Sequence, residues 1–237
     1  MLNSKSRSET KELLDNDFIP KLDLYQNLKE LNFINTWLGG HNVTLKGFNQ
    51  FNFEKGKTYT IIDIGCGGGD NLIILAKWAR KNGLTFKLIG VDLKEDCITY
   101  AIQQCEYYKE ISFVNSDYRD LPNLNIEFDI ALACLFTHHL NSIEISNLLK
   151  WCNANAKLGF IINDLHRHFL AYHSIAWLTA IFSKSYLVKN DAKLSVARGF
   201  VKADWEQILL QINTSKQNVN VKWAWAFRWL VIGKCDL

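Results

Sequence analysis

Three glycines, each separated from the next by one residue, follow a short apolar run in the first third of the chain. Residues 61–70 read Ile-Ile-Asp-Ile-Gly-Cys-Gly-Gly-Gly-Asp, and a helical pattern begins directly after them. Glycine allows the backbone to turn sharply between a strand and a helix and to approach a ligand closely. The residues of this predicted ligand-binding turn are Gly65, Cys66, Gly67 and Gly69.

Two acidic residues limit the kind of ligand that this turn can hold. A dinucleotide-binding turn of the form GxGxxG needs a glycine where Asp70 stands. Asp63, two residues before the first glycine, would repel a pyrophosphate, although an acid there could also cap a helix. The pattern therefore disfavours a nicotinamide oxidoreductase and favours a ligand with a cationic amino group and no phosphate.

Two further acids follow the next predicted strands. Asp92 ends the second strand, where its carboxylate is placed to accept hydrogen bonds from two ribose hydroxyls. It could also cap the helix that begins at Lys94, and the two roles are compatible. Asp117 follows the third strand, where an Asx turn is the simpler alternative to a ligand contact.

Five of the six histidines follow the fourth or the fifth predicted strand, and only His41 lies elsewhere. Carboxyl ends of adjacent parallel strands meet at one edge of a sheet, which is where open α/β sheets bind ligands. The pair His166 and His168 could also suggest a metal site, but no carboxylate or cysteine completes a ligand set, so we predict no metal. The five clustered histidines are His138, His139, His166, His168 and His173.

Strand and helix patterns alternate from residue 59 onward. Apolar strands separated by helices of 10 to 17 residues indicate right-handed βαβ units and a parallel sheet covered on both faces. Residues 218–227 and 228–234 then predict a terminal antiparallel hairpin. The other predicted strands are 59–65, 86–93, 111–118, 128–136 and 157–165, and the predicted helices are 71–83, 94–110, 142–156 and 201–212.

Two segments stand outside this alternation. Residues 1–58 predict one or two helices and a loop, which we interpret as an N-terminal helical cap. Residues 166–200 form an insertion after the fifth strand, apolar and helical at first and basic afterwards. Because it follows the carboxyl end of a strand, this insertion is well placed to act as a lid over a ligand. We expect one domain over residues 1–237.

Composition excludes several classes of protein. The 237 residues are 48% hydrophobic and 22% charged, with a net charge of +3, which is typical of a globular chain and too balanced to indicate nucleic-acid binding. The longest apolar run, residues 169–182, is too short to span a bilayer. The N-terminal residues lack the apolar region of a signal peptide, and the six scattered cysteines suit reduced thiols. We therefore expect a cytoplasmic protein.

These motifs, in this order and at these spacings, resemble the class I S-adenosylmethionine-dependent methyltransferases. The resemblance covers residues 59 to about 165 closely and the terminal hairpin loosely. It implies a Rossmann-like sheet of seven strands, mostly parallel, with a terminal antiparallel hairpin and a helical lid. It also implies S-adenosylmethionine as the cofactor.

The resemblance assigns roles to individual residues. The amino-acid part of the cofactor would lie at Asp63 and the glycines, the ribose at Asp92, and the adenine beside Leu93. Asp117 and Tyr118 would contact the adenine, and the segment from Leu135 to Leu140 would close over the reactive methyl. The cofactor-binding residues implied in this way are Asp63, Gly65, Cys66, Gly67, Gly69, Asp92, Leu93, Asp117, Tyr118 and Leu135.

Transfer of a methyl group to a hydroxyl requires a base to remove the proton, and histidine suits neutral pH. We expect His166 or His168, oriented by Asp164, to be this base. His138 and His139 are the alternatives, although related methyltransferases often carry a histidine there as part of the cofactor wall.

The apolar insertion suggests a hydrophobic acceptor, although the same segment could simply pack on the protein body. The insertion also resembles small-molecule methyltransferases of bacterial secondary metabolism. We therefore predict O-methylation of a phenolic, polyketide-derived or quinone-like molecule. Arg167, Arg198 and Arg228 could bind a carboxylate or phenolate, although each also suits packing or the surface.

Two alternatives remain open at this point. A nucleic-acid methyltransferase of the same superfamily commonly carries an Asn/Asp-Pro-Pro-aromatic motif after the fourth strand, where this chain reads Ala-Cys-Leu-Phe-Thr-His-His. A non-catalytic protein that retains the cofactor pocket would bind the cofactor without turnover.

Overall fold

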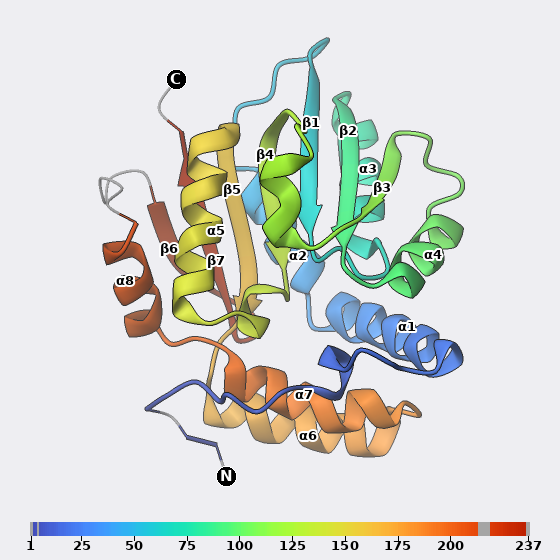
Figure 1. The fold of residues 1–237 in the computed structure, drawn as a ribbon, viewed down its shortest axis with the longest axis vertical. Helices are drawn as coiled ribbons and strands as arrows, with labels where there is room; N and C mark the ends of the chain where they lie inside the picture. The colour runs from blue at the N-terminus through green and yellow to red at the C-terminus, as the bar shows by residue number, and fades with distance from the viewer. Residues whose placement is uncertain (1, 4, 213–218, 236–237) are drawn as a thin grey trace.

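Seven strands form one sheet in the order β3-β2-β1-β4-β5-β7-β6 (Figure 1). The computed structural model describes residues 2–3, 5–212 and 219–235. Strands β1 to β5 run parallel, and β7 runs antiparallel to both of its neighbours. The strands are β1 Thr58–Ile64, β2 Thr85–Asp92, β3 Ile111–Asn115, β4 Phe128–Cys134, β5 Ala156–Leu165, β6 Val219–Ala224 and β7 Arg228–Lys234.

This sheet confirms the predicted fold class, including the terminal hairpin. The order reverses direction between β1 and β4, so the carboxyl ends of these two strands flank the crevice where such sheets bind ligands. Residue 218, with which the predicted hairpin begins, lies outside the described residues.

Helices cover both faces of the sheet, and a third set lies beyond the carboxyl ends of the strands. The α-helices are α1 Lys21–Trp37, α2 Gly40–Phe48, α3 Asp70–Asn82, α4 Glu95–Gln104, α5 Ser142–Asn155, α6 Phe169–Phe182, α7 Tyr186–Arg198 and α8 Lys202–Leu210. Three short 3₁₀ segments are η1 Leu13–Asp15, η2 Tyr118–Asn123 and η3 Thr137–His139. The predicted helix over 94–110 is shorter than expected, because α4 ends at Gln104.

Alternating strand residues build two separate cores, since successive side chains of a strand point to opposite faces. On one face, Ile62 and Ile162 pack in a cluster that includes residues of α5 and α8. On the other face, Ile61 and Ile161 pack with residues of α2 and α3. Burial on both faces explains why the strands read as continuous apolar runs.

The N-terminal segment contributes to two parts of the molecule. Helix α2 packs on the sheet, where Gly47 lies against Ile161 of β5. Helix α1 instead lies beyond the strand ends, together with α6 and α7 (Figure 1). Residues 7–17, which we call the strap, run across α7 before α1 begins.

The insertion after β5 forms two helices, α6 and α7, which pack against each other. Helix α6 contains no charged residue, and several of its large apolar side chains are exposed. No helix among the described residues is long and apolar enough to cross a membrane. The exposed apolar side chains of α6 are Phe169, Leu170, Trp177, Ile181 and Phe182.

Five of the six cysteines are buried, and none of these five forms a disulfide within the described part of the chain. Burial raises the pKa of the Cys66 thiol well above its ordinary value and raises that of Cys134 to about 11. These thiols therefore stay protonated and unreactive at neutral pH.

Candidate cofactor pocket and acceptor site

A cavity of about 430 Å³ opens at the carboxyl ends of β1, β2 and β4. Eight of the ten predicted cofactor-binding residues line it, and Asp63 and Gly69 are the two that do not. Its remaining walls come from the strap, α1, η2 and η3. The eight residues are Gly65, Cys66, Gly67, Asp92, Leu93, Asp117, Tyr118 and Leu135.

The glycine turn places its backbone at the wall of this cavity. Gly65 has a φ of +71°, and a Cβ there would lie 2.2 Å from the Phe136 ring. Its amide and that of Cys66 both donate to the carbonyl of Val91, which fixes the turn beside β2. Gly69 does not face the cavity, because it serves as the N-cap of α3.

Asp63 is the least satisfied group near the cavity. It is 1% exposed, and neither carboxylate oxygen has a hydrogen-bond partner among the described residues. Burial, with smaller effects from Asp92 and Asp70, raises its pKa well above the ordinary value. Three acids therefore crowd one end of the cavity, and a cationic ligand group there would favour their ionised forms.

Asp92 holds the glycine turn and also faces the cavity. Its two oxygens accept hydrogen bonds from the amides of Gly67 and Lys94, both at 2.9 Å. Each carboxylate oxygen can accept more than one hydrogen bond, so capacity remains for ligand hydroxyls. Helix α4 has Lys94 as its N-cap, so Asp92 does not cap this helix itself.

Asp117 lines the cavity but is already satisfied. Its carboxylate caps η2 through the Arg119 amide and forms an ion pair with the Arg119 guanidinium. Asp117 therefore forms the Asx turn that the sequence predicted as the alternative to a ligand contact. The adjacent Tyr118 ring packs edge-on against Phe136, with 5.5 Å between the ring centroids.

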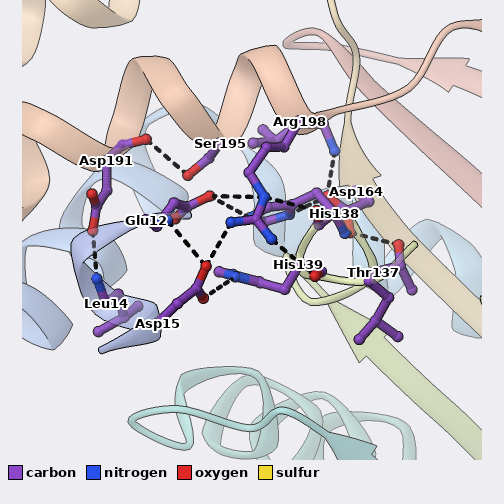
Figure 2. Close-up of polar contacts among 12 residues, drawn as sticks. Glu12, Leu14, Asp15, Thr137, His138, His139, Asp164, Asp191, Ser195 and Arg198 are labelled. Atoms are coloured by element: carbon purple, nitrogen blue, oxygen red, sulfur yellow. Dashed lines mark hydrogen bonds and ion pairs between the residues drawn. The ribbon is translucent and has the colours of Figure 1, made fainter. Parts of the chain in front are cut away.

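Asp164 does not orient His166 or His168, so the predicted pairing was wrong. Figure 2 shows the Asp164 carboxylate directed toward η3. It accepts from the Thr137 hydroxyl and from Nδ1 of His138, both at 2.7 Å. Strands β4 and β5 are neighbours, so η3, which follows β4, lies beside the end of β5. This arrangement brings Thr137 and His138 to Asp164.

His166 and His168 make other contacts outside the cavity wall. His166 accepts a hydrogen bond from the Trp223 indole at 3.2 Å, and His168 caps α6 through the Leu170 amide. Burial, with help from His168 and Arg167, lowers the pKa of His166 to about 4. A histidine with so low a pKa is a weak base at neutral pH.

Of the two histidines of η3, only His139 lines the cavity. Its Nδ1 lies 2.7 Å from Oδ1 of Asp15, which belongs to the strap and also lines the cavity. His138 is buried, and its Nε2 lies 3.5 Å from Glu12 (Figure 2). Burial raises the pKa of Glu12 to about 7.

Glu12, His138 and His139 lie close enough together to suggest a metal site. However, the buried guanidinium of Arg198 approaches Glu12 within 3.9 Å and forms an ion pair with Asp15. A fixed cation at this position supplies the positive charge that a metal ion would otherwise bring.

The sequence predicted an N-terminal helical cap over residues 1–58, but it did not identify which residues of α1 and the strap line the cavity. These residues belong to no motif, and they reach the site only through tertiary packing. One signal was available, because α1 contains several asparagines, which are poor helix formers and therefore suggest another role. The cavity-lining residues of this group are Leu14, Asp15, Asp17, Leu28, Leu31, Asn32 and Asn35.

Comparisons with known proteins agree with this geometry. Residues 61–159 match a family model described as a methyltransferase domain. YqeM of Bacillus subtilis, whose name places it among the methyltransferases, is 31% identical over 94 residues, or 40% of this chain. The mitochondrial ubiquinone biosynthesis O-methyltransferase of Saccharomyces cerevisiae is 24% identical over 146 residues, or 59% of this chain.

These matches cover 34% and 43% of the two relatives, so this chain spans less than half the length of each. A solved structure of a SAM-dependent methyltransferase from Aquifex aeolicus superposes with a TM-score of 0.63 at 17% identity. That superposition covers 90% of this chain and 98% of the other. Residues 61–159 therefore match a methyltransferase domain, and the chain shares the fold of a solved SAM-dependent methyltransferase.

Proposed function

We propose that the chain binds S-adenosylmethionine in the cavity described above and transfers its methyl group to an oxygen of a hydrophobic small molecule. The observation that carries the proposal is the convergence of eight predicted cofactor residues on one cavity. When bound, S-adenosylmethionine supplies a methyl group on a positively charged sulfur. The unpaired Asp63 carboxylate and the remaining acceptor capacity of Asp92 suit its ammonium group and its ribose, respectively.

The nature of the acceptor is supported by α6 and by one relative. Helix α6 lies beyond the strand ends and exposes five large apolar side chains, which suits the binding of an apolar molecule. The yeast relative carries the name of an O-methyltransferase of ubiquinone biosynthesis, which favours an oxygen acceptor on a phenolic or quinone-like molecule.

We assign proton removal to His139. Because a carboxylate only accepts hydrogen bonds, the contact with Asp15 places the imidazole proton on Nδ1 and leaves Nε2 with a free lone pair. Nε2 would take the acceptor's hydroxyl proton as the oxygen attacks the methyl carbon and the carbon–sulfur bond breaks. The products are the methyl ether and S-adenosylhomocysteine.

The first experiment is isothermal titration with S-adenosylhomocysteine, followed by its release from S-adenosylmethionine with a panel of acceptors. The panel contains phenols, quinols, fatty acids and bulk RNA. Binding with turnover on a phenol or quinol supports the proposal. Turnover on RNA alone identifies a nucleic-acid methyltransferase, and absence of cofactor binding overturns the proposal.

The role of His139 is tested with His139→Ala, with His166→Ala as the matched control. A general base contributes about 10²–10⁴-fold, so His139→Ala should lose at least a hundredfold in kcat with unchanged affinity for S-adenosylhomocysteine. The control should remain within twofold of the wild type. A loss of cofactor affinity with unchanged kcat would instead make His139 part of the cofactor wall.

A further inference from the structure

Three arginines were candidates for binding an anion, and the structure distinguishes them. Arg167 forms an ion pair with Asp204, and Arg198 forms one with Asp15. Arg228 forms no ion pair with any carboxylate in the described part of the chain, although it is only 3% exposed. A buried guanidinium without a counterion is costly, because its charge has left water without compensation.

The contacts of Arg228 are with neutral groups. Its Nη2 donates to Oδ1 of Asn35 at 2.9 Å, and its Nη1 donates to Oδ1 of Asn163 at 3.4 Å. Its Nε has no hydrogen-bond partner among the described residues. Asp164 is the carboxylate whose charge acts on Arg228, but His138 and Thr137 already hold that group.

Arg228 belongs to a buried polar cluster of Asn35, Gly40, His41, Asn163 and Arg228, which we call the chamber and of which only Asn35 lines the cavity. Asn35 connects the two, since it accepts from Arg228 and also lines the cavity. A Cβ on Gly40 would lie 1.7 Å from Oδ1 of Asn35 and 2.8 Å from Nη2 of Arg228. Only glycine at this position leaves room for these two polar groups.

Asp63 and Arg228 lie on opposite sides of Cys134 in the strand order, because Asp63 belongs to β1, Cys134 ends β4 and Arg228 begins β7. The strand order β1-β4-β5-β7 puts these two residues on strands at either side of β4 and β5. Asn35 is the member of the chamber that lines the cavity, so an anion bound beside Asn35 would lie near the Arg228 guanidinium.

We propose that the chamber binds an ionised oxygen of the acceptor, through Arg228 and Asn35, as an anchor separate from the oxygen that receives the methyl group. The ligand class is an apolar molecule with one carboxylate or one acidic phenolate. This inference rests on the proposed function, because it assumes that the chain binds a methyl acceptor. Binding of an anion can nevertheless be measured without turnover.

The test is a binding measurement with S-adenosylhomocysteine present. Isothermal titration compares 1-naphthoate with its neutral isostere 1-naphthamide, and 4-nitrophenol above and below its pKa. We expect the charged form of at least one pair to bind at least tenfold more tightly than the neutral form. The two pairs distinguish a carboxylate site from a phenolate site, and equal binding of charged and neutral forms in both pairs overturns the proposal.

Variants of the chamber provide the controls. Arg228→Gln should abolish the preference for the charged form, and Arg228→Lys should retain part of it. Asn35→Asp supplies the missing carboxylate, so it should abolish anion binding and raise the melting temperature of the free protein. Arg80→Gln, on an exposed arginine of α3 that pairs with Glu110, should change nothing.

Two results separate the failure of this inference from failure of the proposed function. If S-adenosylhomocysteine binds and the probes show no preference for charge, only the anion site is wrong. If S-adenosylhomocysteine does not bind, the proposed function itself is wrong. A charge preference that survives in Arg228→Gln also overturns the assignment to Arg228.

Discussion

The molecule contains two groups of buried or half-buried carboxylates, and their surroundings shift the pKa in opposite directions. At the glycine turn, Asp63 has no hydrogen-bond partner within the part of the chain that the structure describes, and burial raises the pKa of Asp70 to about 7. At the junction of the strap with η3, burial opposes ionisation, but His139 and Arg198 hold the pKa of Asp15 below its ordinary value. His138 and Thr137 do the same for the pKa of Asp164.

This difference separates carboxylates that stabilise the fold from carboxylates that are available to a ligand. A carboxylate surrounded by donors contributes to folding, because its charge is compensated within the chain. A buried carboxylate without donors costs folding free energy, and a ligand that supplies the missing positive charge recovers it. The surroundings of Asp63 at the glycine turn therefore support the proposed binding of a cationic ligand group there.

The largest effect is expected at the scaffold carboxylate. Asp164→Ala removes a fully buried charge and leaves His138 without its acceptor, so it should lower the free energy of unfolding by about 3–5 kcal/mol. Urea denaturation measures this change. Glu127→Ala, which breaks the exposed pair with Lys157, is the control and should cost less than about 1 kcal/mol.

The second-largest effect is expected in the pH dependence of stability, which differs between the carboxylates with a raised pKa and those with a lowered pKa. In the unfolded chain an Asp titrates near pH 3.9, so a raised folded pKa means that the folded state holds a proton that the unfolded state loses. Asp70 therefore contributes stability that is present below about pH 4 and is lost as pH rises through about 7. Glu12 acts in the same direction.

Asp70→Asn should reduce this loss by about 1.4 kcal/mol per pH unit between pH 5 and 7 in the ligand-free protein. Urea titrations at several pH values measure it, with Glu12→Gln as the parallel variant. Asp15 and Asp164 titrate in the opposite sense, so their contribution is lost only as pH falls below about 4. An unchanged slope in both variants would show that neither buried acid holds its proton.

Asp63→Asn should weaken S-adenosylhomocysteine binding about tenfold, the equivalent of one charge-assisted contact, and raise the stability of the free protein. Titration with 5′-methylthioadenosine, which lacks the amino-acid part, is the matched measurement. The variant should bind that ligand as well as the wild type does. An equal loss for both ligands would contradict a role toward the ammonium group.

The smallest effect is expected at Asp117, which lies on the cavity wall but is satisfied within the chain. Arg119→Ala breaks an ion pair in which the arginine is exposed, so it should change the free energy of unfolding by less than about 1 kcal/mol. Affinity for S-adenosylhomocysteine should change less than threefold. A larger gain in affinity would mean that Arg119 competes with the ligand for Asp117.

The sequence predicted the sheet well because strands and turns are indicated by local patterns of apolar residues and glycines. Apolar strands such as 157–165 end within one residue of the observed β5, and the glycine turn lies where the motif placed it. The site beyond this motif was less predictable. The Asp164–His138 contact joins residues 26 positions apart, and the His139–Asp15 contact joins residues 124 apart.

Contacts of this second kind depend on how the strap and the strand-end turns pack, which no local pattern encodes. Proximity along the chain was misleading for Asp164, whose nearest histidines in sequence are not its partners. Arg228 shows the same limit, because its lack of a counterion among the described residues is a property of its surroundings and not of its own segment.

The buried cysteines provide a chemical reporter of the cavity. Cys66, Cys97 and Cys134 line it, and burial raises the pKa of each thiol, so alkylation in the native protein should be slow. A ligand that fills the cavity covers the same three sulfur atoms. Mass-spectrometric footprinting with a small alkylating reagent can therefore follow occupancy in unlabelled protein, with the less buried Cys235 as the internal reference.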